Sequence, residues 1–408
     1  MKDAQDNPSQ AAARGEFVRA LIQGAAAGLL LAAMFAAGFL FNDLLEQRTT
    51  SSISLEMLRE ADGLLAAHYL RPLPPDEARI HGAVSGLVES LGDPYSYFVE
   101  PQTAEVDSTN LAGRFGGIGA EIGVNEQGQF FVAQVYRDNP AFEAGLAEGD
   151  LIVAVDGVHV DDGSRDLDGV IALIRGEVGT SVTLSVLRDS QPLELTMVRA
   201  EVLLPSVFWQ IAAQNAQIGY LQITRFTDRT PEEVRQALTE LTDQGAQAFI
   251  LDLRNNGGGL LDSSVEVAGE FLDGGVVLYE KRSGGREQGI NAPRGGSALD
   301  QPLAVLINPG TASASEIVAG ALQDRARAIL IGQNSYGKGT VQAILPMSDG
   351  SSLHITTAEW FTPNQNRLEG QGLQPDRIVE PAGEYDAELL AAVEYLSGVL
   401  VAEGGEQP

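Results

Sequence analysis

Residues 248–259 read AFILDLRNNGGG. The first seven positions are apolar apart from one aspartate and a closing arginine, which predicts a buried strand. Three glycines then end the strand, and a helix is expected from about Leu261. A buried strand followed by a loop and a helix is the repeating unit of α/β folds. Because loops at strand ends carry much of the chemistry in such folds, this stretch predicts a fold class and one side of a candidate site.

The same alternation continues on both sides of this stretch, so we expect an α/β core over residues 201–381. The expected strands are IGYLQITRF (218–226), LAVLIN (303–308) and AILIG (328–332). The expected helices cover residues 231–244, where Thr230 is the first polar cap, and about 313–323.

Two loops of this core carry residues suited to catalysis. NNGGG (255–259) can turn backbone amides toward a developing oxyanion, and TASASE (311–316) begins a helix with hydroxyl side chains. Each also has a purely structural explanation, since glycines make turns and Ser or Thr caps helices. That explanation weakens when Lys338, 25 residues beyond Ser313 and after the next strand, is considered with them.

Lys338 lies in GQNSYGKGT (332–340), which at first resembles a phosphate-binding loop. That pattern requires Ser or Thr directly after the lysine, and a helix whose N-terminus completes the anion site. Here Gly339 follows the lysine, and TVQAIL (340–345) predicts a short strand. We therefore expect no bound nucleotide and a different use of this lysine.

Residues 111–200 show a different sequence pattern. Short runs typical of β-strands alternate with glycine-rich turns, and one helical stretch begins at Leu167. GGIG (116–119) and NPAFEAGLAEGDLIVAVDG (139–157) resemble a PDZ domain. In such a domain successive amides capture a C-terminal carboxylate, while the adjacent strand edge takes up the peptide. The resemblance assigns peptide binding to Gly116, Gly117, Ile118 and Gly119.

Several motifs in order resemble the carboxyl-terminal processing proteases, also called tail-specific proteases. They are LDLRNNGGGLLD (251–262), NPGTASASEIVAGALQD (308–324), GQNSYGKGTVQ (332–342) and GQGLQPD (370–376), and SLGDPYSYF (90–98) fits the segment before the PDZ domain. The resemblance implies a serine endopeptidase with a crotonase/Clp-protease-like α/β core and an inserted PDZ domain. It also implies substrates that are proteins with exposed C-termini, and a homodimer through the helical segments.

By the same resemblance, Ser313 is the nucleophile, Lys338 is its general base and Gln342 orients the lysine. The resemblance assigns the oxyanion hole to Gly258, Gly259 and Ala314.

A lysine base has its own chemical requirement. A serine hydroxyl attacks a peptide carbonyl only when a base removes its proton, and lysine is a base only as the neutral amine. Its pKa must therefore fall from about 10.4 by roughly three units, on the order of 4 kcal/mol, which burial can supply. Gly337 and Gly339 allow close packing around the side chain, and Gln342 would share its face by the period of two.

Other interpretations remain open. A Ser/His/Asp triad could use His354, which lies in the strand-like SSLHITT (351–357). Glu316 could tune the site or only favour the helix N-terminus. Asp252 and Arg254 would hold the strand end and the glycine loop. Two other classes are a catalytically silent PDZ adaptor, disfavoured by the intact candidate residues, and an acyl-CoA hydratase-like enzyme, disfavoured by the PDZ insertion.

Composition excludes further classes. The chain of 408 residues has a net charge of −30 and no cluster of Lys and Arg, so we expect no nucleic-acid partner. There is no cysteine, and the histidines show no metal-ligand spacing, so we expect neither a metal nor another cofactor. These histidines are His68, His81, His159 and His354.

The N-terminal region predicts a membrane anchor. GAAAGLLLAAMFAAGFLF (24–41) is 18 apolar residues without a charge, roughly 27 Å long as a helix. A cleaved signal peptide is the alternative, but NDLLE (42–46) offers no small-x-small cleavage site. The flanking arginines favour a cytoplasmic tail over residues 1–23. We therefore expect a single-pass protein of the cell membrane with an extracytoplasmic catalytic domain.

The complete expected layout is a multidomain α/β protein with one transmembrane helix. After the anchor, a helical region covers residues 42–110, with helices at about 53–70 and 76–91. The PDZ domain follows at 111–200 and the Ser-Lys peptidase core at 201–381. A C-terminal helix and tail occupy residues 382–408.

Overall fold

The computed structural model describes residues 55–161, 163, 165–383 and 385–404. Its contacts divide the chain into two units, residues 1–78 and 79–408. In the first unit, all residues of α2 (Leu55–His68) are exposed. The anchor expected at residues 24–41 lies outside the described part of the chain, and within that part no helix has the length and apolar character needed to cross a bilayer.

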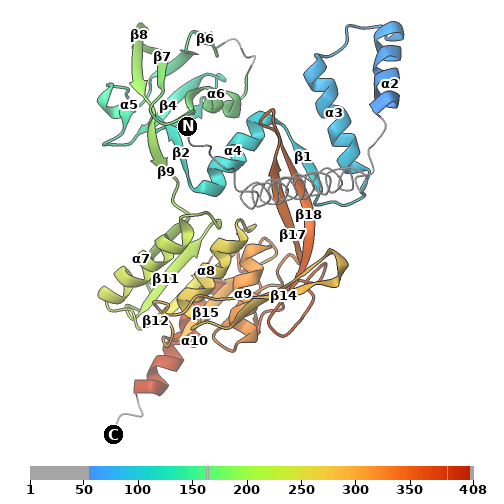
Figure 1. Ribbon diagram of the computed structural model, residues 1–408. Coiled ribbons are helices and arrows are strands. Elements are labelled where there is room, and N and C mark those ends of the chain that lie inside the picture. The colour runs from blue at the N-terminus through green and yellow to red at the C-terminus, as the bar shows by residue number, and fades with distance from the viewer. Residues whose placement is uncertain (1–54, 162, 164, 384, 405–408) are drawn as a thin grey trace, which may run out of the picture. The chain divides into compact units, whose positions relative to one another are not determined.

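Strands between residues 207 and 378 of the second unit form a six-stranded sheet (Figure 1). β10 is antiparallel to β11, and all other neighbours in the sheet are parallel. Every residue of β12 and β15 is buried, as apolar runs covered on both faces require. The order is β10 (Val207–Ile211), β11 (Ile218–Ile223), β12 (Ala248–Asp252), β15 (Leu303–Ile307), β16 (Ile329–Gly332) and β19 (Arg377–Ile378).

Helices cover both faces of this sheet. One face shares a hydrophobic core with three helices, and the other packs against the last helix of the chain. Along β12, Phe249 and Leu251 point to the first face and Ile250 to the second, as the period of two requires. The predicted helices of the core are therefore confirmed. They are α7 (Thr230–Asp243), α8 (Leu261–Phe271) and α9 (Ala314–Asp324), with α10 (Ala387–Gly404) on the opposite face.

A second sheet carries the chain that follows Lys338. β18 (Ser352–Phe361) pairs with β17 (Thr340–Pro346) along one edge, and with β1 (Tyr97–Val99) and β13 (Val276–Arg282) along the other. β14 (Glu287–Asn291) pairs with β13. The strand predicted at 340–345 is present. Sequence periodicity does not predict β1, whose partner strand lies more than 250 residues further along the chain.

Residues 114–203 form a small β domain with its own core. The helix predicted from Leu167 is α6 (Leu167–Ile174), and the Asp166 side chain caps it by accepting the Gly169 N–H at 2.9 Å. The preceding helices are α3 (Asp76–Glu89) and the unpredicted α4 (Pro101–Ala112). The remaining elements are β2 (Arg114–Gly117), β3 (Ala120–Val124), β4 (Phe130–Val135), α5 (Pro140–Glu143), β5 (Leu151–Val155), β6 (Val158–His159), β7 (Ser181–Arg188), β8 (Gln191–Val198) and β9 (Ala200–Leu203).

Candidate active site

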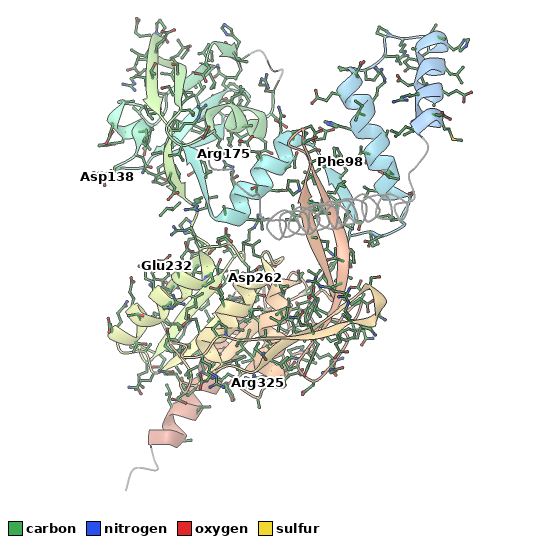
Figure 2. The ribbon with its side chains drawn as sticks, in the orientation of Figure 1. Phe98, Asp138, Arg175, Glu232, Asp262 and Arg325 are labelled. Carbon is green, nitrogen blue, oxygen red and sulfur yellow. The ribbon has the colours of Figure 1, made fainter. Side chains whose placement is uncertain are left out.

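Three loops leave the parallel sheet on the same side. β12, β15 and β16 are parallel neighbours, so the segments that follow their carboxyl ends begin at one edge. These segments carry the glycine loop, Ser313 and Lys338, respectively. Asp262, labelled in Figure 2, lies in the first turn of α8 and marks where the chain continues after the glycine loop. This edge is where open α/β sheets usually bind their ligands.

Ser313 has an unusual backbone conformation at the start of α9. Its φ of 57° and ψ of −118° lie outside the regions that L-residues ordinarily occupy. Gly258 packs closely against it, because a Cβ added to this glycine would lie 2.9 Å from the Ser313 Cβ. The serine is half-buried. A strained residue of this kind persists only where the surrounding structure fixes it, as functional sites commonly do.

Two backbone amides of the glycine loop, those of Gly257 and Gly259, have no acceptor among the described residues. The Gly258 N–H donates to Oδ1 of Asn256 at 2.9 Å, and the Gly258 carbonyl accepts the Phe226 N–H at 3.0 Å. Gly259 has a φ of 143°, and an added Cβ would lie only 2.0 Å from the Phe226 carbonyl oxygen. Within the described residues, the N–H groups of Gly259 and Ala314 have no acceptor. Two of the three predicted oxyanion residues thus present free donors, and Gly258 contributes close packing.

Glu316 joins the nucleophile loop to the lysine loop. It is completely buried. Its Oε2 accepts the Ser313 N–H at 2.8 Å and the Lys338 N–H at 2.9 Å. Its Oε1 accepts the Gly337 N–H and the Ser335 hydroxyl, both at 2.6 Å. All four partners donate, which matches a carboxylate, so this side chain fixes the backbones of Ser313 and Lys338 relative to each other.

The Lys338 side chain is partly buried. Burial lowers the pKa of its amine below the ordinary value of 10.5, and the carboxylates of Glu369 and Glu316 oppose that shift. Nζ lies 5.3 Å from the centre of the Tyr95 ring. The Lys338 carbonyl accepts the indole N–H of Trp360 at 3.0 Å. A lysine whose pKa is lowered by burial is a candidate general base.

Ser313 Oγ and Lys338 Nζ are not hydrogen bonded to each other in the described structure. The Gln342 amide donates to the hydroxyls of Thr340 at 2.9 Å and Thr356 at 3.3 Å, and makes no hydrogen bond to Lys338. β17 begins only at Thr340 and shifts register just before Gln342, so strand alternation does not run unbroken from Lys338 to Gln342. The structure thus ties Ser313 to Lys338 through Glu316, while Gln342 bonds within the second sheet.

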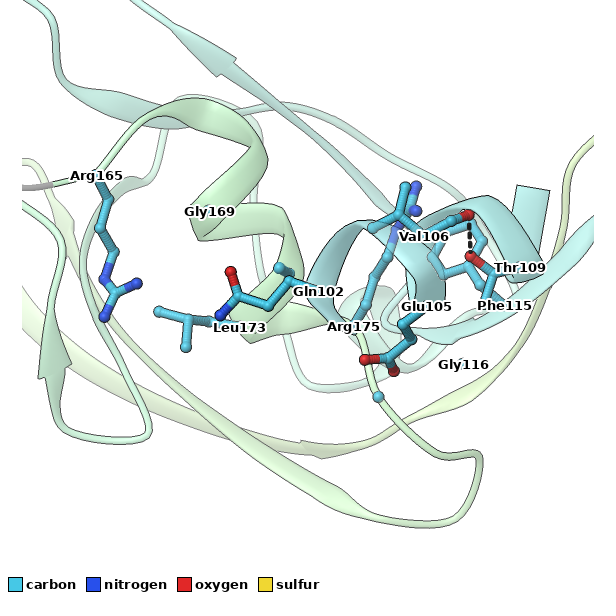
Figure 3. Close-up of a pocket in the computed structure, with 12 residues that line it drawn as sticks. Gln102, Glu105, Val106, Thr109, Phe115, Gly116, Arg165, Gly169, Leu173 and Arg175 are labelled. Carbon is cyan, nitrogen blue, oxygen red and sulfur yellow. Dashed lines mark hydrogen bonds between the residues drawn. The ribbon is translucent and has the colours of Figure 1, made fainter. Parts of the chain in front are cut away.

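Three of the four predicted peptide-binding residues line a groove of about 740 Å³ in the small β domain. They are Gly117, Ile118 and Gly119, and α6 forms the facing wall. Gly116 instead lines a neighbouring pocket of about 180 Å³ between α4 and α6 (Figure 3). Arg175 borders both hollows, with its guanidinium 4.0 Å from the centre of the Phe115 ring.

His354 has no geometric support as a catalytic base. It is buried on β18 and stacks on Tyr97 with ring centres 4.6 Å apart. Burial lowers the pKa of its imidazole. Within the described residues its Nε2 has no hydrogen-bond partner, and the hydrogen bonds of Ser313 go to Glu316 and Ile317 instead. The interpretation as a Ser/His/Asp triad therefore loses its base.

Asp252 and Arg254 hold the end of β12, as expected from their positions. The Arg254 guanidinium donates to Asp252 at 2.6 Å. It also donates to Asp386 at 2.7 Å and Glu388 at 2.6 Å, at the start of α10. Local sequence patterns do not predict these ion pairs with the start of α10, because more than 130 residues separate the partners.

Family models match two parts of the chain. Residues 217–379 match peptidase family S41, and residues 131–188 match the PDZ domain. The fold and the site therefore define a serine peptidase that carries a PDZ domain.

Known relatives extend the match over most of the chain. The carboxyl-terminal-processing protease of Synechocystis sp. (strain ATCC 27184 / PCC 6803 / Kazusa) is 34% identical over 349 residues, 84% of this chain and 81% of the relative. Carboxy-terminal processing protease CtpB of Bacillus subtilis (strain 168) is 32% identical over 84% of this chain and 71% of the relative. The solved photosystem II D1 C-terminal processing protease is 31% identical, over 84% of this chain and 91% of that one, with a TM-score of 0.47. The chain belongs to the carboxyl-terminal processing proteases of peptidase family S41.

Proposed function

We propose that this protein is a membrane-anchored serine endopeptidase with a Ser-Lys mechanism that acts on proteins with exposed C-termini. Ser313 Oγ attacks the peptide carbonyl while the neutral amine of Lys338 takes its proton. The lysine then gives that proton to the leaving amine, and the Ser313 ester remains as the acyl-enzyme. A water molecule, deprotonated by Lys338, hydrolyses the ester, and Gln342 orients the lysine.

The tetrahedral intermediate carries a negative oxygen that needs donors. The free N–H groups of Gly259 and Ala314 serve this role in the proposal, with Gly258 holding the loop against the serine. Backbone donors fixed before the reaction stabilise the developing charge without reorganising. Removing one such donor typically costs about 100- to 1,000-fold in kcat.

Substrate capture is assigned to the groove of the PDZ domain. The amides of Gly117, Ile118 and Gly119 would bind the terminal carboxylate, and the peptide would add as a strand at the domain edge. Because Ser313 and Lys338 are not yet hydrogen bonded, we expect peptide binding to favour the arrangement in which they meet. Binding and activation would then be one event.

The remaining parts of the proposal concern surroundings and assembly. The apolar residues 24–41 would anchor the chain in the cell membrane, with the catalytic domain outside the cytoplasm. The core would be of the crotonase/Clp-protease-like type, and two chains would associate through their N-terminal helical segments, whose α2 is exposed along its whole length.

The observation that carries this proposal is the Glu316 carboxylate, which accepts N–H groups from both Ser313 and Lys338. The test uses the full chain in detergent with a protein that ends in an unstructured, apolar tail. Cleavage, followed by mass spectrometry, should occur with the native chain and disappear in Ser313→Ala and Lys338→Ala. Exposed Ser283 and Lys281 provide matched controls, and Ser283→Ala and Lys281→Ala should cleave normally.

Other outcomes identify the competing classes. A native chain that binds the tail but leaves it intact, like its Ser313→Ala form, would be an adaptor. Hydrolysis of a thioester without peptide cleavage would indicate a hydratase-like enzyme. Cleavage that survives Lys338→Ala would exclude the Ser-Lys mechanism.

A further inference from the structure

The segment that precedes the PDZ domain reaches the lysine side of the site. β1 pairs with β18 in antiparallel register, with Phe98 opposite Leu353, and Figure 2 shows Phe98 beside the β17–β18 hairpin. Two residues before β1, the centre of the Tyr95 ring lies 5.3 Å from Lys338 Nζ. The motif SLGDPYSYF (90–98), to which sequence analysis assigns no catalytic role, therefore brings an aromatic side chain to the proposed base.

The Tyr95 ring is tied to the backbone beside Lys338. Its hydroxyl donates to Oε1 of Glu369 at 3.2 Å. The other oxygen of Glu369 accepts the N–H of Gly339, the residue directly after the lysine, at 2.8 Å. The Tyr95 N–H in turn donates to Asp93 Oδ1 at 3.1 Å. The ring and the lysine backbone are therefore held in one hydrogen-bonded unit.

The same segment also reaches Gln342. Ser96 Oγ donates to Asp93 Oδ2 at 2.5 Å and accepts the Thr356 N–H at 3.0 Å. The Thr356 hydroxyl accepts the Gln342 amide at 3.3 Å. Residues 93–96 thus contact the surroundings of both Lys338 and Gln342, although they lie more than 240 residues earlier in the chain.

We propose that Tyr95 is a positioning residue for Lys338: its ring face holds the protonated amine in the resting enzyme and releases the neutral amine to Ser313. This inference rests on the proposed role of Lys338 as the base. An aromatic face attracts an ammonium group through its quadrupole and has no such attraction for a neutral amine. The Tyr95 ring therefore favours the protonated form of Lys338, which cannot act as a base, and fixes the position of its ammonium group.

Other groups that face Lys338 stay constant in a test that alters only the ring. The charged and titratable ones are Glu316 on α9, Glu369 in the loop after β18, and His354 on β18. The phenol of Tyr95 itself has a pKa raised by burial, so it stays neutral over the working range of pH. Changing the electron density of the ring at nearly constant shape isolates its contact with the ammonium group.

The experiment uses the full chain with Tyr95→Phe as the reference, because this change removes the hydroxyl that donates to Glu369. Fluorinated phenylalanines, from monofluoro to pentafluoro, are then placed at the same position and compared with that reference. Two rates are measured against pH: kcat/KM for an unstructured peptide, and labelling of Ser313 by a fluorophosphonate, which does not depend on peptide capture. Fluorination removes the negative ring face, so protonation of Lys338 becomes less favourable. The acid limb of both profiles should move to lower pH, by about 0.5 to 1 pH unit across the series.

Tyr97 is the matched control, since it lies on the same segment but stacks on His354. Tyr97→Phe and its fluorinated forms should leave the acid limb in place. An acid limb that stays fixed through the Tyr95 series, or moves equally in the Tyr97 series, would overturn the inference. The role of Tyr95 can fail while the Ser-Lys mechanism holds: this is the case if the Tyr95 series gives such an outcome but Lys338→Ala abolishes cleavage. If Lys338→Ala still cleaves, both proposals fail. Thermal unfolding of each variant verifies that it is folded.

Discussion

Glu316 Oε2 accepts the backbone N–H of Lys338 at 2.9 Å across 22 residues of chain. The same oxygen accepts the Ser313 N–H at 2.8 Å, so one buried atom fixes both backbones. Helix N-terminal carboxylates are common and often do no more than favour the helix. Here the Glu316 side chain also accepts hydrogen bonds from the loop that follows β16, at Ser335, Gly337 and Lys338. Glu316 is therefore the residue that joins the two halves of the proposed site.

Glu316→Gln tests this role. All four partners donate, so the new NH₂ group must face at least one donor, and a buried carboxylate with good hydrogen bonds is lost. We expect a loss of about 2 to 4 kcal/mol in the free energy of unfolding and at least about 100-fold in kcat. Thermal unfolding and cleavage assays measure the two effects. Glu232 is an exposed residue in the first turn of α7 (Figure 2), and Glu232→Gln should change neither.

Gly259 and Gly257 provide a matched pair within one loop. Gly259→Ala introduces a Cβ where the Phe226 carbonyl already lies, at a φ that L-residues avoid, so the loop must move. Gly257→Ala meets nothing within 4 Å. We expect Gly259→Ala to lower kcat by about 100-fold or more through loss of an oxyanion donor, with Gly257→Ala close to the native rate. Equal rates for the two variants would remove Gly259 from the oxyanion hole.

Local patterns predicted the core well because its elements are strongly periodic. The apolar run of β12 and the helices after it depend on their own residues, and parallel strands then bring the loops to one edge. Ser313 and Lys338 were placed by that logic together with the family resemblance. Their common partner Glu316 was identified only as a residue that could tune the site, since burial and four hydrogen bonds depend on loops distant in sequence.

Other parts of the site depend on long-range pairing that no local pattern contains. Tyr95 approaches Lys338 only because β1 joins the edge of β18. The period-of-two argument for Gln342 assumed a continuous strand, and β17 instead starts at Thr340 and shifts register before Gln342. Bulges of this kind depend on the partner strand as much as on the strand itself.

The pH dependence of activity should respond to Glu369. Burial lowers the pKa of Lys338, and the nearby carboxylate of Glu369 partly reverses that shift. Since the lysine must be neutral to act as a base, activity should rise as pH increases through its pKa. Glu369→Gln removes the negative charge and keeps a hydrogen-bonding amide, so the pKa should fall further and the acid limb of kcat/KM should move to lower pH. Glu359→Gln, which changes a half-buried carboxylate on β18 that pairs with Arg367, is the control. A limb that moves to higher pH would contradict this assignment.

Arg254 should couple the C-terminal helix to the end of β12. Its guanidinium binds Asp252, Asp386 and Glu388, of which Asp252 and Glu388 are buried. Arg254→Met leaves these carboxylates unpaired, and we expect a loss of about 3 to 5 kcal/mol in the free energy of unfolding. Arg254→Lys should recover only part of it, because an ammonium group cannot reproduce the planar fork.

The acid dependence of stability provides an independent readout of the same cluster. Burial alone would raise the pKa of Asp386, but hydrogen bonds from Arg254 and the Leu389 N–H hold it below its ordinary value of 3.8. A carboxyl group with a lowered pKa contributes stability that is present above 3.8 and is lost as pH falls through the folded-state value. Arg254→Met should therefore flatten the fall in Tm between about pH 5 and pH 3. Arg367→Met, which removes an exposed ion pair with Glu359, should leave that slope unchanged. An unchanged slope in Arg254→Met would show that Asp386 does not depend on this guanidinium.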